Sequence, residues 1–188
     1  MARVPYPDDM SDNPEAAAAI AAFPAAINIV RLTAHAASLT PVLLELAARM
    51  MTTLDLPARQ RELLVMVVSR ETHCEYEWVQ HLPQAIAAGV DEADLDRLSG
   101  SDPSPWPEAA DAALIRAATA CLRTTGCDAD TMAELVAQVG VRRAIEALYV
   151  VGIVRMFTTV INSTDPEIDA AGAQFAVAWR ARAQQATR

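Results

Sequence analysis

The sequence is poor in aromatic residues, in glycine and in positive charge. Aromatic side chains make up 5% of its 188 residues, six residues are glycine, and 15 Lys and Arg stand against 24 Asp and Glu, a formal net charge of −9. Few glycines and few β-branched runs, beside long alanine-rich stretches, favour an all-α protein. The acidic balance argues against nucleic acid and against an anionic membrane as partners, because both attract a basic surface.

Cysteines and long apolar runs are also scarce. Cys74, Cys121 and Cys127 form an odd and sparse set, unlike the framework of a secreted disulfide-rich protein. The first residues lack the basic-then-apolar pattern of a signal peptide. The apolar runs LLVMVV and ALYVVGIV fall well short of the ~20 residues that a membrane span needs. We therefore expect a soluble, cytoplasmic protein without a membrane partner.

Prolines and glycines divide the chain into eight to ten helices around one core, with no convincing strand. Residues 1–13 are expected to form an extended arm and residues 14–188 a single-domain multi-helix bundle, interrupted by a loop at 99–108. Helices are expected at 16–22, 27–37, 41–53, from 57 through LLVMVV, 74–88, 91–98, 107–124, from 128 or 130 to 140, 141–160 and 166–183.

Polar residues mark several of the expected helix ends. Thr40 precedes a proline and is expected to cap the helix that follows. Asp91, and either Asp128 or Asp130, should cap two later helices. Gly89 should end the helix that begins near position 74, because glycine readily adopts the left-handed conformation found there.

The residues that carry chemistry gather between Glu62 and His81. Cys74, Glu77 and His81 follow one another at i, i+3 and i+7, so on a helix they share one face. Glu62 lies twelve positions before Cys74 and could reach the same place from a preceding helix. A carboxylate beside an imidazole orients the ring and raises its basicity, so Glu77 and His81 could transfer a proton near neutral pH. The bulky Tyr76 next to Glu77 indicates that this face is enclosed.

A metal site is an alternative interpretation of the same segment. His73, Glu77 and His81 are spaced at i, i+4 and i+8 and could face one ion, although no further ligand nearby completes the shell.

Thiol chemistry is the other alternative. Cys74 lies near a helix N-terminus, where the helix dipole lowers the pKa of a thiol. A dithiol peroxidase also needs a resolving cysteine, and Glu77 stands in its place. Cys121 and Cys127 are far away in sequence, and six positions do not align on a helix. A single-thiol cycle, reduced by an outside thiol, remains open.

The segment PARQRELLVMVVSRETHCEYEWVQHLPQAIAAGVDEADL (57–95) resembles the carboxymuconolactone decarboxylase-like / alkylhydroperoxidase D-like superfamily. Its peroxidase branch carries a glutamate, eleven residues, then Cys-x-x-Cys-x-x-x-His. Glu62, Cys74 and His81 match this pattern, whereas Glu77 replaces the second cysteine. The decarboxylase branch carries a glutamate four residues before the histidine, followed by an aromatic residue, as Glu77 and Trp78 are here. The resemblance is strongest over about residues 55–98 and favours the decarboxylase branch.

This resemblance implies an all-α fold of the alkylhydroperoxidase D-like type whose motif helix lines a pocket. It also implies a homo-oligomer, commonly a trimer or hexamer, and no cofactor. Carried over to this chain, it makes His81 the acid–base, Glu77 its orienting group, Glu62 a relay or second base, and Cys74 a thiol without its partner.

Three further residues are candidates for contact with a small-molecule substrate. Arg155, a lone charge in an apolar helix, could pair with a substrate carboxylate or with Glu62. Tyr76 and His35 could line the same pocket.

Three functions follow from these residues. The first is cofactor-independent proton transfer of the carboxymuconolactone decarboxylase type, on a small cyclic or unsaturated carboxylic acid. The second is a thiol-dependent peroxidase (peroxiredoxin activity) that uses Cys74, and the third is a non-catalytic helical oligomer.

Overall fold

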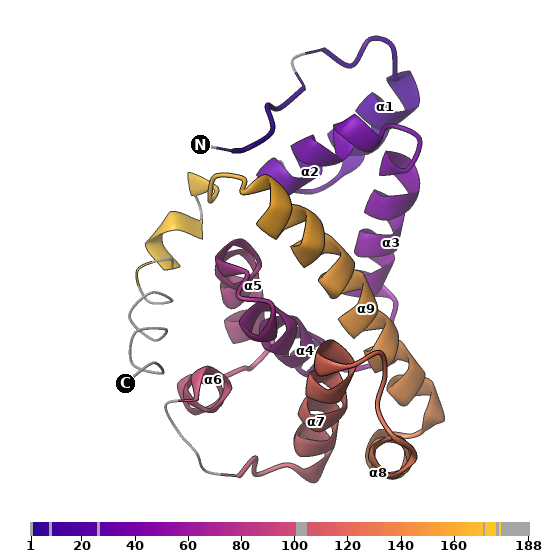
Figure 1. Cartoon of the computed structure of the whole chain (residues 1–188), viewed down its shortest axis with the longest axis vertical. Helices are drawn as coiled ribbons and strands as arrows, with labels where there is room; N and C mark the ends of the chain where they lie inside the picture. Colours follow the sequence, from indigo (N-terminus) through magenta and orange to yellow (C-terminus); the bar gives the residue numbers. More distant parts are fainter. Residues whose placement is uncertain are drawn as a thin grey trace.

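The computed structural model describes residues 2–7, 9–25, 27–100, 105–170, 172–175 and 177. Within these residues every regular element is a helix, which confirms the all-α class and the expected number of helices (Figure 1). The helices are α1 (Pro14–Ala22), α2 (Asn28–Thr33), the short 3₁₀ helix η1 (Ala34–Ala36), α3 (Thr40–Thr52), α4 (Ala58–Glu71), α5 (Glu75–Ala87), α6 (Glu92–Ser99), α7 (Ala109–Arg123), α8 (Ala129–Val139) and α9 (Val141–Thr164).

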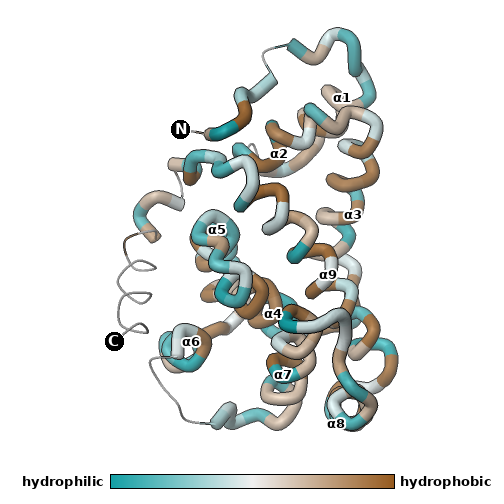
Figure 2. Tube along the Cα trace, in the orientation of Figure 1, coloured by the Kyte–Doolittle hydropathy of each residue, from teal (hydrophilic) through white to brown (hydrophobic). Residues whose placement is uncertain are grey.

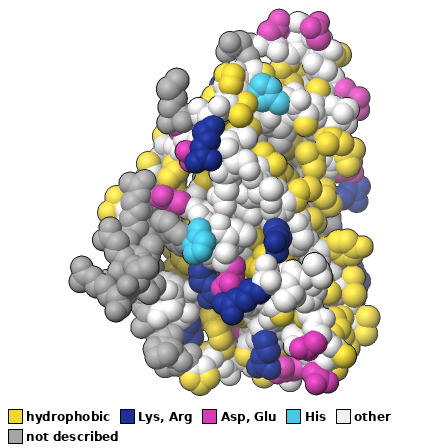
Figure 3. All heavy atoms as spheres, in the orientation of Figure 1, with side chains coloured by type: hydrophobic (Ala, Val, Ile, Leu, Met, Phe, Trp, Pro, Cys, Tyr) yellow, Lys and Arg dark blue, Asp and Glu magenta, His cyan; other side chains and the backbone are white. Residues whose placement is uncertain are grey.

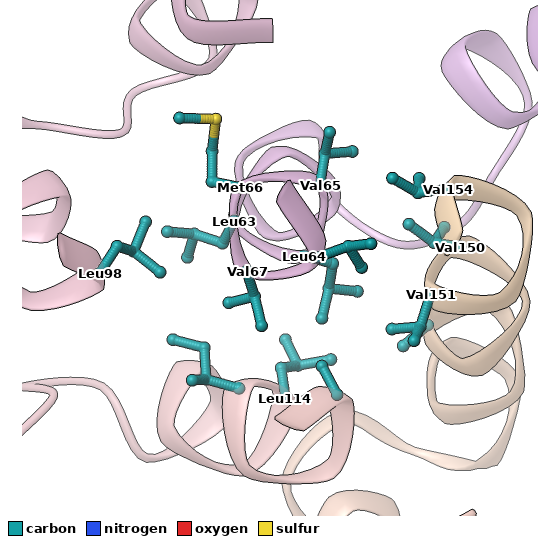
Figure 4. Packing of buried hydrophobic residues seen from close by; sticks show 14 of the residues in the cluster. Leu63, Leu64, Val65, Met66, Val67, Leu98, Leu114, Val150, Val151 and Val154 are labelled. Atoms are coloured by element: carbon teal, nitrogen blue, oxygen red, sulfur yellow. The ribbon is translucent and has the colours of Figure 1, made fainter. Parts of the chain in front are cut away.

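Helix α4 forms the centre of the core. Its residues 62–69 are all buried, so protein encloses this helix on every side. Helices α5, α7 and α9 pack around it, and α6 touches it. The apolar side chains of α4 meet Leu114 of α7 and Val150 and Val154 of α9 (Figure 4), and the hydropathy colouring shows the same apolar centre (Figure 2). A charged side chain on α4 must therefore find its partner inside the protein.

Helix α5 follows α4 after a tight turn. Cys74 is the residue just before the helix, and its carbonyl accepts the first helical hydrogen bond from the amide of Trp78. The expected end is confirmed, because Gly89 follows with a φ of 98°, in the left-handed region that suits glycine. The helix continues through Pro83 to Ala87.

The predicted N-terminal caps are confirmed at two helices. The Asp91 side chain accepts from the amide of Asp94, whose own side chain accepts in return, so a capping box opens α6. Asp128, rather than Asp130, caps α8 by accepting from the amide of Thr131.

The cap predicted at Thr40 is wrong. Thr40 is already the first residue of α3, and its hydroxyl donates to the carbonyl oxygen of Thr33, 2.7 Å away in α2. The buried hydroxyl thus ties α3 to α2 rather than serving its own helix, because a carbonyl at the end of α2 lies within reach.

Helix α9 is longer and more continuous than the apolar runs of the sequence suggest. At 24 residues it is long and apolar enough to cross a membrane by length and composition alone, which is weak evidence, since core helices pass the same test. In this fold α9 packs against α4, α7 and α8.

The two ends of the described chain meet near the end of α9. Residues 2–7 and 9–13 contain no helix, and the amide of Arg3 donates to the carbonyl oxygen of Thr164. The helix predicted at 166–183 is only partly described: residues 166–169 are not helical, residues 170, 172–175 and 177 are, and the rest of that range lies outside the described residues, as do positions 101–104 of the predicted loop.

Candidate active site

The site is built on a contact between α4 and α5. Nδ1 of His81 lies 3.0 Å from Oε2 of Glu62. The Glu62 side chain is 0% exposed and that of His81 is 16% exposed. The buried carboxylate accepts a hydrogen bond from the imidazole, which fixes the orientation of the ring. The structure therefore brings together the two residues that the sequence places on neighbouring helices.

The cation that balances Glu62 is Arg61, which the sequence analysis missed. Nη2 and Nε of Arg61 donate to Oε1 of Glu62 at 2.9 and 3.1 Å, and Nη1 donates to the carbonyl oxygen of Met51 at 3.0 Å. Consecutive residues in a helix do not ordinarily face each other, so the position of Arg61 next to Glu62 in the sequence did not indicate an ion pair. The need of a buried carboxylate for a cation was the available clue.

Glu77 completes the group from one turn earlier in α5. Its Oε1 lies 3.5 Å from Nε2 of His81, and its side chain is 10% exposed. His81 is therefore placed between two carboxylates, with Glu62 at one ring nitrogen and Glu77 at the other.

This arrangement shifts the pKa of all three groups. Burial alone would lower the pKa of His81, but the hydrogen bond to Glu62 and the charges of Glu77 and Glu62 outweigh burial and raise it. Burial would raise the pKa of Glu62, but the hydrogen bond and charge of His81, then those of Arg61, lower it. The pKa of Glu77 is raised, mainly by burial. The surroundings thus favour the charged forms of Glu62 and His81, whereas burial favours the neutral form of Glu77.

A cavity of about 330 Å³ opens onto the Glu77 and His81 side of this group. Gln80 and Gln84 of α5 share the polar end, and the remaining wall is mostly apolar. It is formed by Phe23, Pro24, Ala25, Ile27, Ile29, Val30, Thr33, Leu44, Ala47, Met50, Met51, Tyr76 and Phe157. No Lys or Arg occurs among these described lining residues, so His81 is the one side chain of the lining that can carry positive charge.

Tyr76 lines this cavity, but its hydroxyl is already engaged. The hydroxyl donates to Oδ2 of Asp169 at 2.5 Å and accepts from the amide of Ile29 at 3.1 Å. Burial, followed by the hydrogen bond to Asp169, raises the pKa of Tyr76. Gln80 donates to the same carboxylate oxygen. Asp169 therefore fixes two residues of the cavity wall. The sequence did not indicate this role, because Asp169 is far from Tyr76 and Gln80 along the chain.

Cys74 lies outside the cavity lining. Its side chain is 0% exposed, in a small apolar cluster with Ile29, Tyr76 and Ile161. The prediction of a lowered thiol pKa is wrong: burial raises the pKa of Cys74 to about 12, because removal from water outweighs the helix N-terminus. This environment does not favour a thiolate.

Arg155 and His35 are also misplaced by the sequence-based prediction. Nη1 of Arg155 donates to the carbonyl oxygen of Leu122 at 2.8 Å, at the end of α7 and away from Glu62. Nε2 of His35 lies 2.7 Å from the carbonyl oxygen of Pro5, beside a separate apolar cavity. Neither residue lines the cavity at His81.

The geometry does not support the metal alternative. His73 lies in the turn before α5 with a φ of 52°, and it lines a different, polar cavity with Asp165. Among the described residues, no group of three His, Cys, Asp or Glu side chains is arranged to hold a metal ion.

Comparisons with known proteins fit this site. Residues 37–119 match the model of the carboxymuconolactone decarboxylase family, and the match includes Glu62, Glu77 and His81. The resemblance predicted from the motif is confirmed.

A similar solved structure is that of a variant of the debrominase Bmp8 in complex with 2,3,4-tribromopyrrole. It has a TM-score of 0.73 and 16% sequence identity, and the alignment covers 96% of each chain. At this identity the likeness shows a shared fold. No curated protein sequence matches the chain significantly.

Proposed function

We propose that this protein is an enzyme that transfers a proton to or from a carbon atom of a small cyclic or unsaturated carboxylic acid, without a cofactor. The observation that carries the proposal is the placement of His81 between Glu62 and Glu77 in the wall of a mostly apolar cavity. One ring nitrogen is held by a buried carboxylate, and the other side of the ring belongs to the cavity. This is the arrangement of an oriented general acid–base.

Decarboxylation is the reaction that this site supports best. Carbon dioxide leaves, the bonding electron pair stays on the substrate carbon, and a proton from His81 or Glu77 reaches that carbon. Solvent then returns a proton to the enzyme, so the step is balanced without an oxidant or reductant. The substrate must itself delocalise the electron pair, as a β-keto acid or a vinylogous lactone acid can. The apolar wall suits the ring, and the bound tribromopyrrole of the structural neighbour shows that a related fold accepts a small ring.

The charged side chains of the cavity lining restrict the range of possible substrates further. Because His81 is the one side chain of the described lining that can be positive, the site suits an acid with a single carboxylate on an otherwise apolar body. A second carboxylate would lie in an apolar wall without a counter-ion, which is costly.

The peroxidase alternative has no support from the geometry of Cys74. A thiol that is fully buried, has a raised pKa and lies outside the cavity lining is a poor nucleophile toward peroxide.

The test is a screen of β-keto and vinylogous lactone acids for release of carbon dioxide, run in D₂O with NMR detection of deuterium at the product carbon. The proposal expects at least one monoacid to be turned over with deuterium incorporated. If the folded protein binds ring acids and neither releases carbon dioxide nor exchanges carbon-bound hydrogen, the non-catalytic alternative is favoured instead.

Assembly into a homo-oligomer, a trimer or a hexamer, is part of the same proposal, as is a cytoplasmic location. The outer face of α9 exposes Val141, Ile145, Tyr149, Met156 and Val160 at helical spacing, opposite the face that packs on α4 and α7. Hydrophobic side chains gather along the edge of the molecule where α3 and α9 lie (Figure 3). Another copy of the chain can cover this stripe, because contact there removes apolar side chains from water and desolvates no charge on the stripe.

A further inference from the structure

The turn between α7 and α8 brings two cysteines together. Helix α7 ends at Arg123, two residues after Cys121, and the chain then reverses direction. The Thr124 hydroxyl lies 2.9 Å from the carbonyl oxygen of Ala120 and 2.6 Å from that of Gly126, which holds the turn closed. Cys127 is therefore carried back toward the end of the helix. The spacing of six positions, which does not align on a helix, is compatible with contact because Cys127 is not in the helix.

The two cysteines lie near each other. Cys127 is close enough to influence the pKa of Cys121, both residues line the same cavity, and both thiols are free. Burial, followed by the neighbouring Cys127, raises the pKa of Cys121, which keeps its S–H available as a donor. Arg155 bonds the carbonyl oxygens of Cys121 and Leu122 and so fixes the end of α7 that carries the first thiol.

A reagent can reach this pair. Cys121 and Cys127 are half-buried, and both line an open cavity of about 620 Å³ between α7, α8 and α9. Gly152 of α9 lines the same cavity without a side chain. Cys74, by contrast, is fully enclosed on another side of the core. The chain therefore has one accessible pair of thiols and one inaccessible thiol.

We propose that Cys121 and Cys127 form a reversible redox dithiol that exchanges with low-molecular-weight disulfides, independently of the site at His81. In the first step one cysteine, as its thiolate, attacks a sulfur of the small disulfide, and one small thiolate leaves. In the second step the other cysteine attacks the protein sulfur of this mixed disulfide and expels the second small thiolate. The two cysteines lose two electrons, and the small disulfide gains them to become two thiols. The turn favours the second step because it holds the resolving thiol beside the mixed disulfide.

The test treats the full-length protein with glutathione disulfide, blocks remaining thiols with iodoacetamide under denaturing conditions, and digests with trypsin. Cleavage at Arg116, Arg123 and Arg142 places Cys121 in peptide 117–123 and Cys127 in peptide 124–142. The proposal expects these two peptides to be recovered as one disulfide-linked species that dithiothreitol separates. Cys74, in peptide 71–97, is the internal control and should be recovered alkylated.

Two single variants sharpen the result. In Cys121→Ser the remaining Cys127 should keep a stable glutathione adduct, because no second thiol is present to displace it, and Cys127→Ser should behave in the corresponding way at Cys121. The proposal is overturned if the wild-type peptides are recovered unlinked, either alkylated or each with its own glutathione. His81→Gln should leave the disulfide linkage between the two peptides unchanged. Failure of the dithiol proposal can therefore be distinguished from failure of the proposed catalysis.

Discussion

The imidazole of His81 is hydrogen-bonded to the carboxylate of Glu62, a residue 19 positions earlier that no solvent reaches. Glu62 lies in the fully buried segment of α4, next to Arg61, whose side chain is 12% exposed. Orientation and protonation of His81 are therefore set by the interior of the protein. Four predictions concern this pair and the cavity beside it, and a fifth concerns the outer face of α9.

Replacing Glu62 with glutamine should strongly destabilise the protein. The change keeps the shape of the side chain but leaves Arg61 and His81 without their buried counter-charge, and breaking a buried pair in this way costs about 3–5 kcal/mol. Urea unfolding of Glu62→Gln measures the loss. Glu45→Gln is the matched control, because Glu45 forms an exposed pair with Arg49 that should contribute at most about 0.5 kcal/mol. Equal stability of the two variants would contradict the buried pair.

The stability of the protein should depend on pH through His81 in a defined direction. Because the pKa of His81 is raised on folding, its contribution is fully present below about pH 6.5, the unfolded value, and is lost as pH rises through the folded pKa. Glu62 has a lowered pKa, so its contribution is present above about pH 4.3 and is lost as pH falls through its folded pKa.

Unfolding free energies of wild type and His81→Gln, measured across this range, test the relation. The difference between the two proteins should be largest at mildly acidic pH and should shrink as pH rises above neutrality. A difference that grows with rising pH would show that His81 is held in its neutral form.

His81→Gln should also reduce turnover of the substrate found by the acid screen by about 10²–10⁴-fold, the usual range for losing a general acid–base. The readout is kcat together with deuterium incorporation at the product carbon. His35→Gln provides the control, because that histidine is exposed and lies outside the cavity. Full turnover by His81→Gln with an intact fold would rule out the proposed role.

The cavity should prefer an acid with one carboxylate to a diacid on the same ring. Isothermal titration calorimetry with such a matched pair should show weaker binding of the diacid, by at least about tenfold if one carboxylate is desolvated without a partner. Ala47→Phe, which places a ring inside the cavity, should abolish binding of both, whereas Ala87→Phe on the exposed face of α5 should not. Tighter binding of the diacid would indicate a cation outside this lining.

The apolar stripe on α9 should hold copies of the chain together. Tyr149 is 69% exposed at the middle of the stripe, so Tyr149→Glu places a charge where a second copy should pack. Light scattering after size exclusion should show a trimer or hexamer for wild type and smaller species for Tyr149→Glu. Gln138→Glu adds the same charge on an exposed position of α8 and should leave the assembly intact. A monomeric wild type would contradict the proposal.

Local patterns in the amino-acid sequence were enough to predict most of the helices and part of the site. Pro57, Gly89 and the aspartate caps set helix ends through local backbone preferences, and the run LLVMVV carried enough apolar surface to require burial. The spacing of Glu77 and His81 fixed their contact, because residues four apart in a helix always lie side by side.

The surroundings of these residues could not be predicted, because they are formed by segments far apart in the sequence. Cys74 was expected to be a thiolate, but burial raises its pKa and favours the thiol. The cation that pairs with Glu62 is Arg61, whereas Arg155 bonds a carbonyl oxygen at the end of α7. Asp169 holds Tyr76 in the cavity wall by a hydrogen bond, and the reversal after α7 brings Cys127 back toward Cys121. Helix formation depends on neighbours along the chain, whereas the charge and reactivity of a buried group depend on side chains that the fold brings from distant positions.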